Sequence, residues 1–214
     1  MKTKKININN ENDYNKFLNK LFLYKSVFYY NTLFVVDTKT DNKMLTYIIE
    51  TLNIKNRKKR ITYIYDNSCK MIDDSTPKNM CGFKNGKCYL QRSSKSKNCN
   101  GCCGKCLYQS KEGCPTKNLA CKLFNCSEVK SRYNMITADD LKILRLLSLK
   151  NQLVIKSDYF SKREDVLKDL YAYTLTYSTI RVVYRLIKNN YLLKKDLLWL
   201  LLNRSFFHYI LIKK

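Results

Sequence analysis

Residues 81–126 read CGFKNGKCYLQRSSKSKNCNGCCGKCLYQSKEGCPTKNLACKLFNC, and this stretch holds nine of the ten cysteines of the chain. Thiolates at such density are soft ligands that favour zinc or an iron–sulfur cluster. The stretch lacks sustained apolar periodicity, so it cannot bury enough surface to fold around a hydrophobic core of its own. We therefore expect a metal to take the place of that core.

The cysteine spacing indicates two metal centres. Cys99-x2-Cys102 and Cys103-x2-Cys106 are CxxC pairs, in which a tight turn can aim both sulfurs at one ion. Cys102 and Cys103 are adjacent, and adjacent thiolates point more naturally to opposite sides, so they would serve different centres. The sole histidine, His208, lies among apolar residues near the C-terminus, which favours coordination by thiolates alone. The predicted cofactors are two zinc ions or an iron–sulfur cluster.

Ten thiols exceed the need of two four-coordinate sites. Cys69 is left out because it precedes the polar linker 73–77, and Cys99 is left out because it ends a flexible loop rich in Ser, Lys and Asn. The eight predicted metal ligands are Cys81, Cys88, Cys102, Cys103, Cys106, Cys114, Cys121 and Cys126.

The chain is strongly basic, with 41 Lys and Arg against 17 Asp and Glu and a net charge of +24. Such a balance favours polyanionic partners, either nucleic acid or an anionic membrane surface. An AT-rich genome would also raise the lysine content, although it would not explain the shortage of acids. Residues 81–126 contain nine Lys or Arg and one acid, Glu112, so part of the excess would offset the charge of the thiolate centres.

Residues 101–126 resemble the YkgJ-type families of zinc- or iron-chelating cysteine-cluster proteins. Those families have a CC pair, a further Cys before a Leu- or Tyr-containing stretch, then Gly-Cys and a Cys followed by a basic residue. The matching positions here are Cys102-Cys103, Cys106, Gly113-Cys114 and Cys121-Lys122. The usual Arg-Pro dipeptide before the last pair is absent, and Asn118-Leu119-Ala120 stands there instead. The resemblance implies metal chelation with an undefined physiological role.

Composition divides the chain into three regions. Residues 1–72 form an α/β N-terminal region, residues 73–130 the cysteine-rich metal-binding segment, and residues 131–214 a helical C-terminal region. The predicted fold class is α+β, with a small N-terminal strand–helix–strand region, a metal-stapled cysteine-rich middle and a helical C-terminal region.

The first region alternates between helical and extended patterns. Apolar residues predict helices over 14–22 and 44–52, because they recur at i, i+3, i+4 and i+7. β-Branched and aromatic residues predict strands over 27–37 and 61–65, with residues 56–60 as a basic connection. The result is a strand–helix–strand unit whose strands can run parallel.

The third region is predicted to be mainly helical. Thr137 with Asp140, and Ser161 with Glu164, have the spacing of a capping box at a helix start. Apolar residues follow both pairs at helical spacing, and the second pattern continues to residue 187. A short strand is predicted over 153–155, and a last helix begins at 194–196.

Three functions remain open. The first is a cytoplasmic metal-binding protein with two all-cysteine centres. The second is a nucleic-acid-binding or regulatory protein with a zinc-ribbon-like knot, in which Arg57–Arg60 and the basic loop 92–97 meet phosphates. The third is an iron–sulfur redox protein.

Catalysis is not predicted. The chain has no Gly-rich phosphate loop or HExxH motif. We expect no signal peptide, because residues 1–10 are polar and basic and no apolar stretch follows them. No stretch is long enough without charge to span a bilayer. The predicted location is the cytoplasm, where thiols stay reduced.

Overall fold

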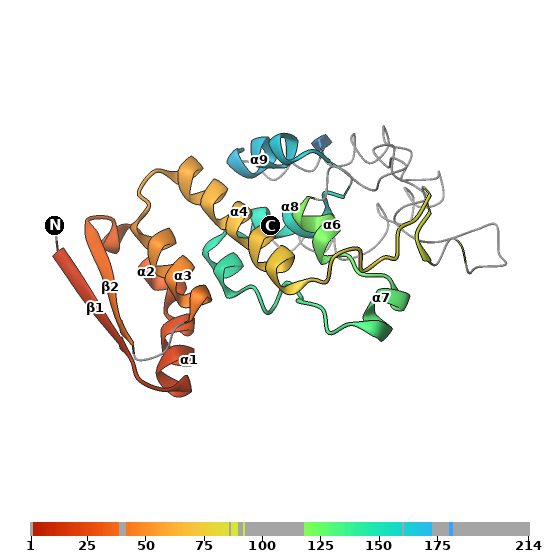
Figure 1. Ribbon diagram of the computed structural model, residues 1–214. Coiled ribbons are helices and arrows are strands. Elements are labelled where there is room, and N and C mark those ends of the chain that lie inside the picture. Colours follow the sequence, from red (N-terminus) through yellow and green to blue (C-terminus); the bar gives the residue numbers. More distant parts are fainter. Residues whose placement is uncertain are drawn as a thin grey trace, which may run out of the picture.

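The computed structural model describes residues 2–38, 42–85, 87–89, 92, 118–159, 161–172 and 180–181. Within these ranges the fold is mixed, with a two-stranded sheet and a majority of helices (Figure 1). The elements in chain order are β1 (Lys2–Ile8), α1 (Glu11–Asn19), α2 (Leu21–Tyr24), η1 (Val27–Tyr29), β2 (Thr32–Thr38), α3 (Lys43–Asn53), α4 (Arg57–Ser75), α6 (Leu119–Leu123), α7 (Ser127–Arg132), η3 (Lys142–Leu146), α8 (Leu149–Ser157) and α9 (Arg163–Tyr171). Among these described helices, none has the length and apolar character needed to cross a bilayer.

The sheet pairs β1 and β2 in parallel, with Lys2 opposite Thr32 and Ile8 opposite Thr38. The helices α1 and α2 connect the two strands, so the sheet is parallel but it is not built from the predicted strand 27–37, helix 44–52 and strand 61–65. Its first strand, β1, was not predicted, because only Ile6 and Ile8 of this strand are buried. The second strand begins later than predicted, since residues 27–29 form the 3-10 turn η1.

The two predicted N-terminal helices are present. Over residues 14–22 the chain forms α1 and α2, with Phe17, Leu18 and Leu21 buried. Over residues 44–52 it forms α3, whose buried side chains follow the predicted stripe. Phe22 departs from the prediction because α1 ends at Asn19, and its side chain is 78% exposed.

The predicted strand over 61–65 is wrong, because these residues lie within α4. Asn56 caps this helix by accepting a hydrogen bond from the Lys59 N–H at 3.0 Å. The buried positions Ile61, Ile64 and Ile72 follow helical spacing, and a five-residue window is too short to separate this period from that of a strand. Residues 57–60, predicted to be a connection, form the first turn of the helix.

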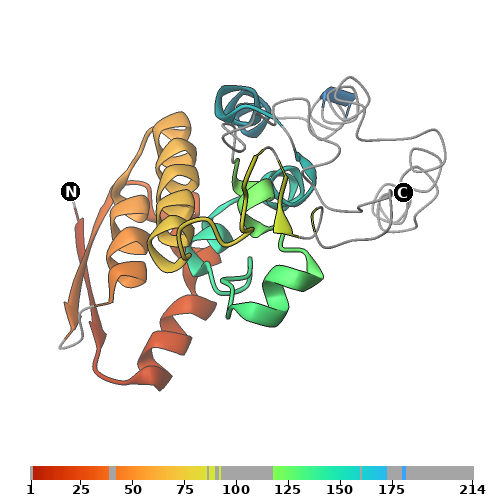
Figure 2. The same cartoon turned by 45° about the vertical axis from the view of Figure 1, so that its right-hand side comes forward.

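Helix α4 joins the N-terminal part of the protein to the C-terminal helices. It contacts α3, η3, α6 and α9, and it lies between them in both views (Figures 1 and 2). The Tyr65 hydroxyl accepts a hydrogen bond from the Leu119 N–H at 3.1 Å, and Arg163 holds Asp66 through two contacts of 2.8 and 2.6 Å. One continuous cluster of buried apolar side chains results, from β1 to α9.

The C-terminal region is helical as predicted, within the described residues. The predicted strand over 153–155 is wrong, because Val154 and Ile155 are buried on α8. The Thr137–Asp140 pair exists, since the Thr137 N–H and hydroxyl donate to Asp140 Oδ2 at 2.8 and 2.7 Å. It closes a turn before the 3-10 helix η3, and it does not start an α-helix.

Ser161 does not cap α9 as the capping-box spacing predicts. Its hydroxyl donates to the Asp158 carboxylate, and Lys162 occupies the cap position of the helix. The apolar stripe is confirmed, because Val166, Leu167 and Leu170 are buried. The predictions beyond Ala172, including the helix from 194–196 and the position of His208, lie outside the described residues except at 180–181, which are helical.

Candidate metal centre

Four of the eight predicted ligands lie in the described part of the chain. Cys81 and Cys88 follow α4, Cys121 lies within α6, and Cys126 immediately precedes α7. The predicted ligands outside the described residues are Cys102, Cys103, Cys106 and Cys114. Cys99 lies outside them too.

Cys81 and Cys88 are brought together by a hairpin. The Lys84 N–H donates to the Lys87 carbonyl at 2.9 Å, and the Lys87 N–H returns a bond to the Lys84 carbonyl at 3.2 Å. Next to this pair, the Tyr89 N–H donates to the Cys81 carbonyl at 2.9 Å. The backbones of the two cysteines therefore lie side by side at the base of the hairpin, although six residues separate them in the sequence.

The turn before the hairpin depends on two left-handed residues. Asn79 has a φ of 54° and Gly82 a φ of 55°. The Asn79 side chain accepts from the Phe83 N–H at 2.6 Å, and the Asn79 carbonyl accepts from the Gly82 N–H at 2.8 Å. A Cβ atom on Gly82 would lie 3.3 Å from Tyr89 Cβ, so both the backbone conformation and the close approach favour glycine here.

The position of Cys121 is set by a buried asparagine. Asn118 caps α6 by accepting the Cys121 N–H at 2.9 Å. Its amide nitrogen donates to the carbonyls of Asp158 and Ser161 at 2.8 and 2.9 Å, and the side chain is buried. Because α6 has only five residues, it depends on these contacts and on the hydroxyl of Tyr65 for its place on α4.

The two cysteine pairs lie on neighbouring elements. The Arg132 guanidinium of α7 lies 3.9 Å from the centre of the Tyr89 ring at the end of the hairpin. Lys122 of α6 forms an ion pair with Asp73 near the end of α4. Figures 1 and 2 show the yellow segment after α4 beside the green helices α6 and α7. Within the described ranges, no three metal-ligating side chains gather into one group.

Cys69 has the surroundings of a structural thiol. It lies on α4, and burial raises the pKa of its thiol to about 12. The neighbouring carboxylates of Asp73 and Asp66 also raise this pKa, whereas the cations of Lys122 and Arg163 lower it. A thiol with such a pKa stays protonated near neutral pH, whereas zinc and iron bind the thiolate. This environment agrees with leaving Cys69 out of the ligand set.

Arg57 of the basic run 57–60 has a structural role. Arg57 donates to the carbonyls of Tyr171 and Leu170 at 2.7 and 3.3 Å, which caps the C-terminal end of α9. Arg60 is half-buried, and burial together with the neighbouring Arg57 lowers its pKa. Lys58 and Lys59 are exposed and Arg60 is half-buried, so these three residues, unlike Arg57, are open to an anionic partner.

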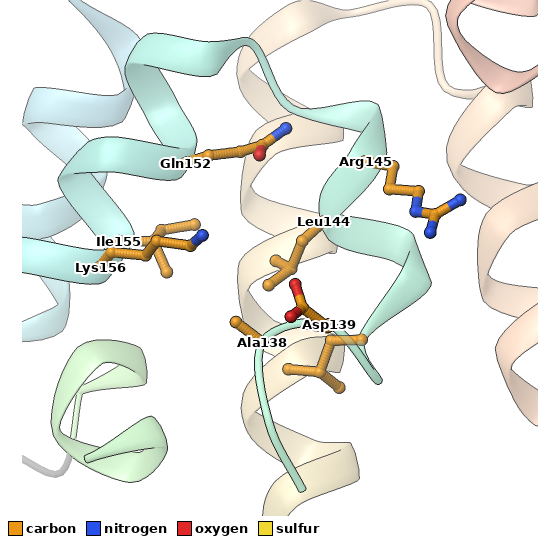
Figure 3. A pocket seen from close by; sticks show the side chains of 8 residues that line it. Ala138, Asp139, Leu144, Arg145, Gln152, Ile155 and Lys156 are labelled. Atoms are coloured by element: carbon orange, nitrogen blue, oxygen red, sulfur yellow. The ribbon is translucent and has the colours of Figure 1, made fainter. Parts of the chain in front are cut away.

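A small pocket between η3 and α8 contains no cysteine (Figure 3). Its volume is about 60 Å³. The residues lining it are Ala138, Asp139, Leu141, Leu144, Arg145, Gln152, Ile155 and Lys156.

No protein-family model, curated protein or solved structure matches this chain. The resemblance of residues 101–126 to the YkgJ-type families therefore stays a prediction.

Proposed function

We propose that this chain is a metal-binding protein whose cysteine-rich middle folds around two all-thiolate centres, holding zinc ions or an iron–sulfur cluster. The observation that carries the proposal is the hairpin that places Cys81 beside Cys88. The proposed location is the cytoplasm, where thiols stay reduced and a cysteine pair is more prone to bind metal than to form a disulfide.

Two centres are favoured over one by the distribution of the described ligands. Cys81 and Cys88 lie on the hairpin, while Cys121 and Cys126 lie on α6 and at the start of α7. These pairs do not gather into a single group of three or more ligands within the described residues. Each pair would therefore contribute to its own centre, and the other four predicted ligands would complete both sites with four thiolates.

The proposed role of the metal is to hold the cysteine-rich segment against α4. The contacts that tie this segment to the described core include the Tyr65–Leu119 hydrogen bond, the Asn118 contacts and the Lys122–Asp73 ion pair. Because the adjacent Cys102 and Cys103 would serve different centres, the two centres together would link the hairpin to the α6–α7 segment. Four thiolates leave a closed coordination sphere, which is typical of structural sites and leaves no open position for a substrate.

Elemental analysis and a visible spectrum of anaerobically purified protein test the proposal. We expect two zinc ions per chain in a colourless protein, whereas a brown protein containing iron and sulfide would identify the cluster form. Less than one metal ion per chain would refute metal binding as the function.

Cysteine-to-serine variants locate the ligands. Cys81→Ser and Cys121→Ser should each lower the metal content by about one ion per chain, since each removes a ligand from a different centre. Cys69→Ser is the matched control, because Cys69 lies on α4 with a raised pKa, and it should keep the full metal content. Equal metal loss in all three variants would contradict the assignment, and circular dichroism would show whether each variant still folds.

A further inference from the structure

Residues 22–30 form an exposed apolar surface at the end of the molecule that carries the sheet. Five of the nine exposed large apolar side chains in the described part of the chain lie there. Their exposed fractions are 78% for Phe22, 47% for Leu23, 88% for Val27, 90% for Phe28 and 60% for Tyr30. These side chains form the 22–30 surface, and they belong to α2, to η1 and to Tyr30, which follows η1. In Figure 1, the elements around it lie at the opposite end of α4 from α6 and α7.

Buried side chains pack beneath the 22–30 surface and fix its position. Leu21 and Tyr24 are buried, and the Tyr24 ring lies 5.4 Å from the rings of both Tyr29 and Phe34. The Tyr29 N–H donates to the Ser26 carbonyl at 3.1 Å, so the turn itself is hydrogen-bonded. The exposed side chains are therefore presented by an ordered backbone. An exposed apolar group on an ordered element is typical of a docking surface.

Lysine and arginine side chains flank this surface, in sequence segments that contain no acidic residue. Residues 14–36 and 51–65 contain no Asp or Glu but eight Lys or Arg. Lys25 Nζ lies 5.0 Å from the centre of the Phe22 ring, and Lys55 Nζ donates to the Thr32 carbonyl at 2.7 Å. Arg60 is close enough to Lys25 and Lys55 to lower the pKa of both, in addition to the larger effect of burial. Among the described residues, no carboxylate forms an ion pair with these three cations.

The chemistry of the exposed side chains favours lipid over nucleic acid. The two most exposed side chains, Val27 and Phe28, are consecutive, and one of them is aliphatic. Bases stack on aromatic rings, so Val27 and Leu23 would gain nothing from a single-stranded nucleic acid. Aliphatic and aromatic side chains both gain from insertion at the boundary between headgroups and acyl chains, and neighbouring Lys and Arg attract anionic headgroups.

We infer that the 22–30 surface docks on an anionic membrane, with Val27 and Phe28 inserted at the headgroup–acyl boundary and Lys25, Lys55 and Arg60 beside the headgroups. Tyr30 would lie at the headgroup level, where its hydroxyl stays hydrated. This inference is independent of the metal centres, because the surface and the cysteines lie on different elements.

Co-sedimentation of the full metal-loaded chain with lipid vesicles tests the inference. We expect the protein to pellet with vesicles of phosphatidylserine and phosphatidylcholine, and to stay in solution with vesicles of phosphatidylcholine alone. The fraction bound should fall as salt is added, because headgroup attraction is screened. Absence of binding to the anionic vesicles, or equal binding to both vesicle types, would overturn the inference.

Substitutions at the tip give a sharper test. Val27→Ser with Phe28→Ser should weaken binding by roughly tenfold or more, since burial of one such side chain is worth about that factor. Both side chains are almost fully exposed, so the folded protein and its metal content should not change. The matched control is Leu149→Ser on α8, which removes an apolar side chain that is 61% exposed outside this surface and should bind as wild type. Wild-type binding by the double variant would refute the inference.

A labelled oligothymidine distinguishes the competing partner. We expect the oligonucleotide neither to bind through Phe22 and Phe28 nor to displace the protein from anionic vesicles. Displacement by the oligonucleotide, together with loss of its binding in Phe22→Ser, would assign the surface to single-stranded nucleic acid and overturn the lipid inference.

Discussion

Asn118→Ala should destabilise the protein by more than the loss of an ordinary helix cap. The wild-type side chain makes three hydrogen bonds, one to the Cys121 N–H and two to the carbonyls of Asp158 and Ser161. Its exposed fraction is 2%, so water cannot replace these contacts without rearrangement. At about 1 kcal/mol for each bond, the free energy of unfolding should fall by about 3 kcal/mol.

The matched control is Asn56→Ala. Asn56 also caps a helix, since its Oδ1 accepts the Lys59 N–H, but it is exposed. Its replacement should cost about 1 kcal/mol, the usual value for a helix cap. The difference of about 2 kcal/mol between the two variants isolates the two bonds that Asn118 donates to α8 and the segment after it.

Urea unfolding followed by circular dichroism measures both variants at equal metal loading. Asn118→Asp is a useful third variant, because it keeps the acceptor for the cap but places a carboxylate against two carbonyls. It should be at least as unstable as Asn118→Ala if the donated bonds matter. A midpoint for Asn118→Ala that equals that of Asn56→Ala would refute the reasoning.

Three further variants test other parts of the structure. Gly82→Ala should weaken metal binding roughly tenfold in a chelator competition, because the φ of 55° at this position costs a non-glycine residue about 1–2 kcal/mol. An unchanged metal affinity would contradict the role of the hairpin in metal binding. Tyr65→Phe leaves the Leu119 N–H without its acceptor and should lower the free energy of unfolding by about 1–2 kcal/mol in urea, which an unaltered midpoint would disprove. Burial, with the nearby Arg57, lowers the pKa of Lys150 to about 8. Above pH 8 the unfolded state therefore binds more protons than the native state, so the free energy of unfolding, measured relative to that of Lys150→Met, should rise from pH 8 towards pH 10. A difference between the two proteins that does not change with pH would contradict this prediction.

Helical periodicity was the most informative sequence pattern. The stripe over 44–52 predicted α3 and its buried side chains, because its nine residues cover more than two helical turns and do not fit the period of a strand. Phe22 shows the limit of this reasoning, since periodicity alone does not say where a helix ends. Asn19 and Lys20 end α1, and the side chain of Phe22 is then turned to solvent.

The strand predictions failed where the window was short. Residues 61–65 and 153–155 are rich in Ile, Val and Tyr, which favour strands locally, but each group is part of a longer helix. The tertiary contacts of α4 and α8 outweigh that local preference. Strand β1 was missed for another reason, because lysines stand at positions 2 and 4, on the same face of the strand as the buried Ile6 and Ile8, and so hide the apolar alternation.

The candidate cysteine ligands could be chosen from the sequence, but the approach of Cys81 to Cys88 could not be predicted. The CxxC spacing does not include this pair, which a hairpin brings together across six intervening residues. A usable signal was present, because Asn85-Gly86 is the dipeptide most typical of a tight hairpin turn, and Asn85 has a φ of 52°.

The contacts of Asn118 link the stability of the core to the geometry of the proposed metal centre. A five-residue helix such as α6 does not persist alone, so Cys121 is positioned only while Asn118 and Tyr65 hold this helix to its neighbours. Because Cys121 is already positioned, less conformational entropy is lost when the metal binds. By linkage, bound metal must then stabilise the attachment of α6 to the core. Asn118→Ala should therefore also weaken metal binding, and its loss of stability should be larger in the metal-loaded protein than in the metal-free protein.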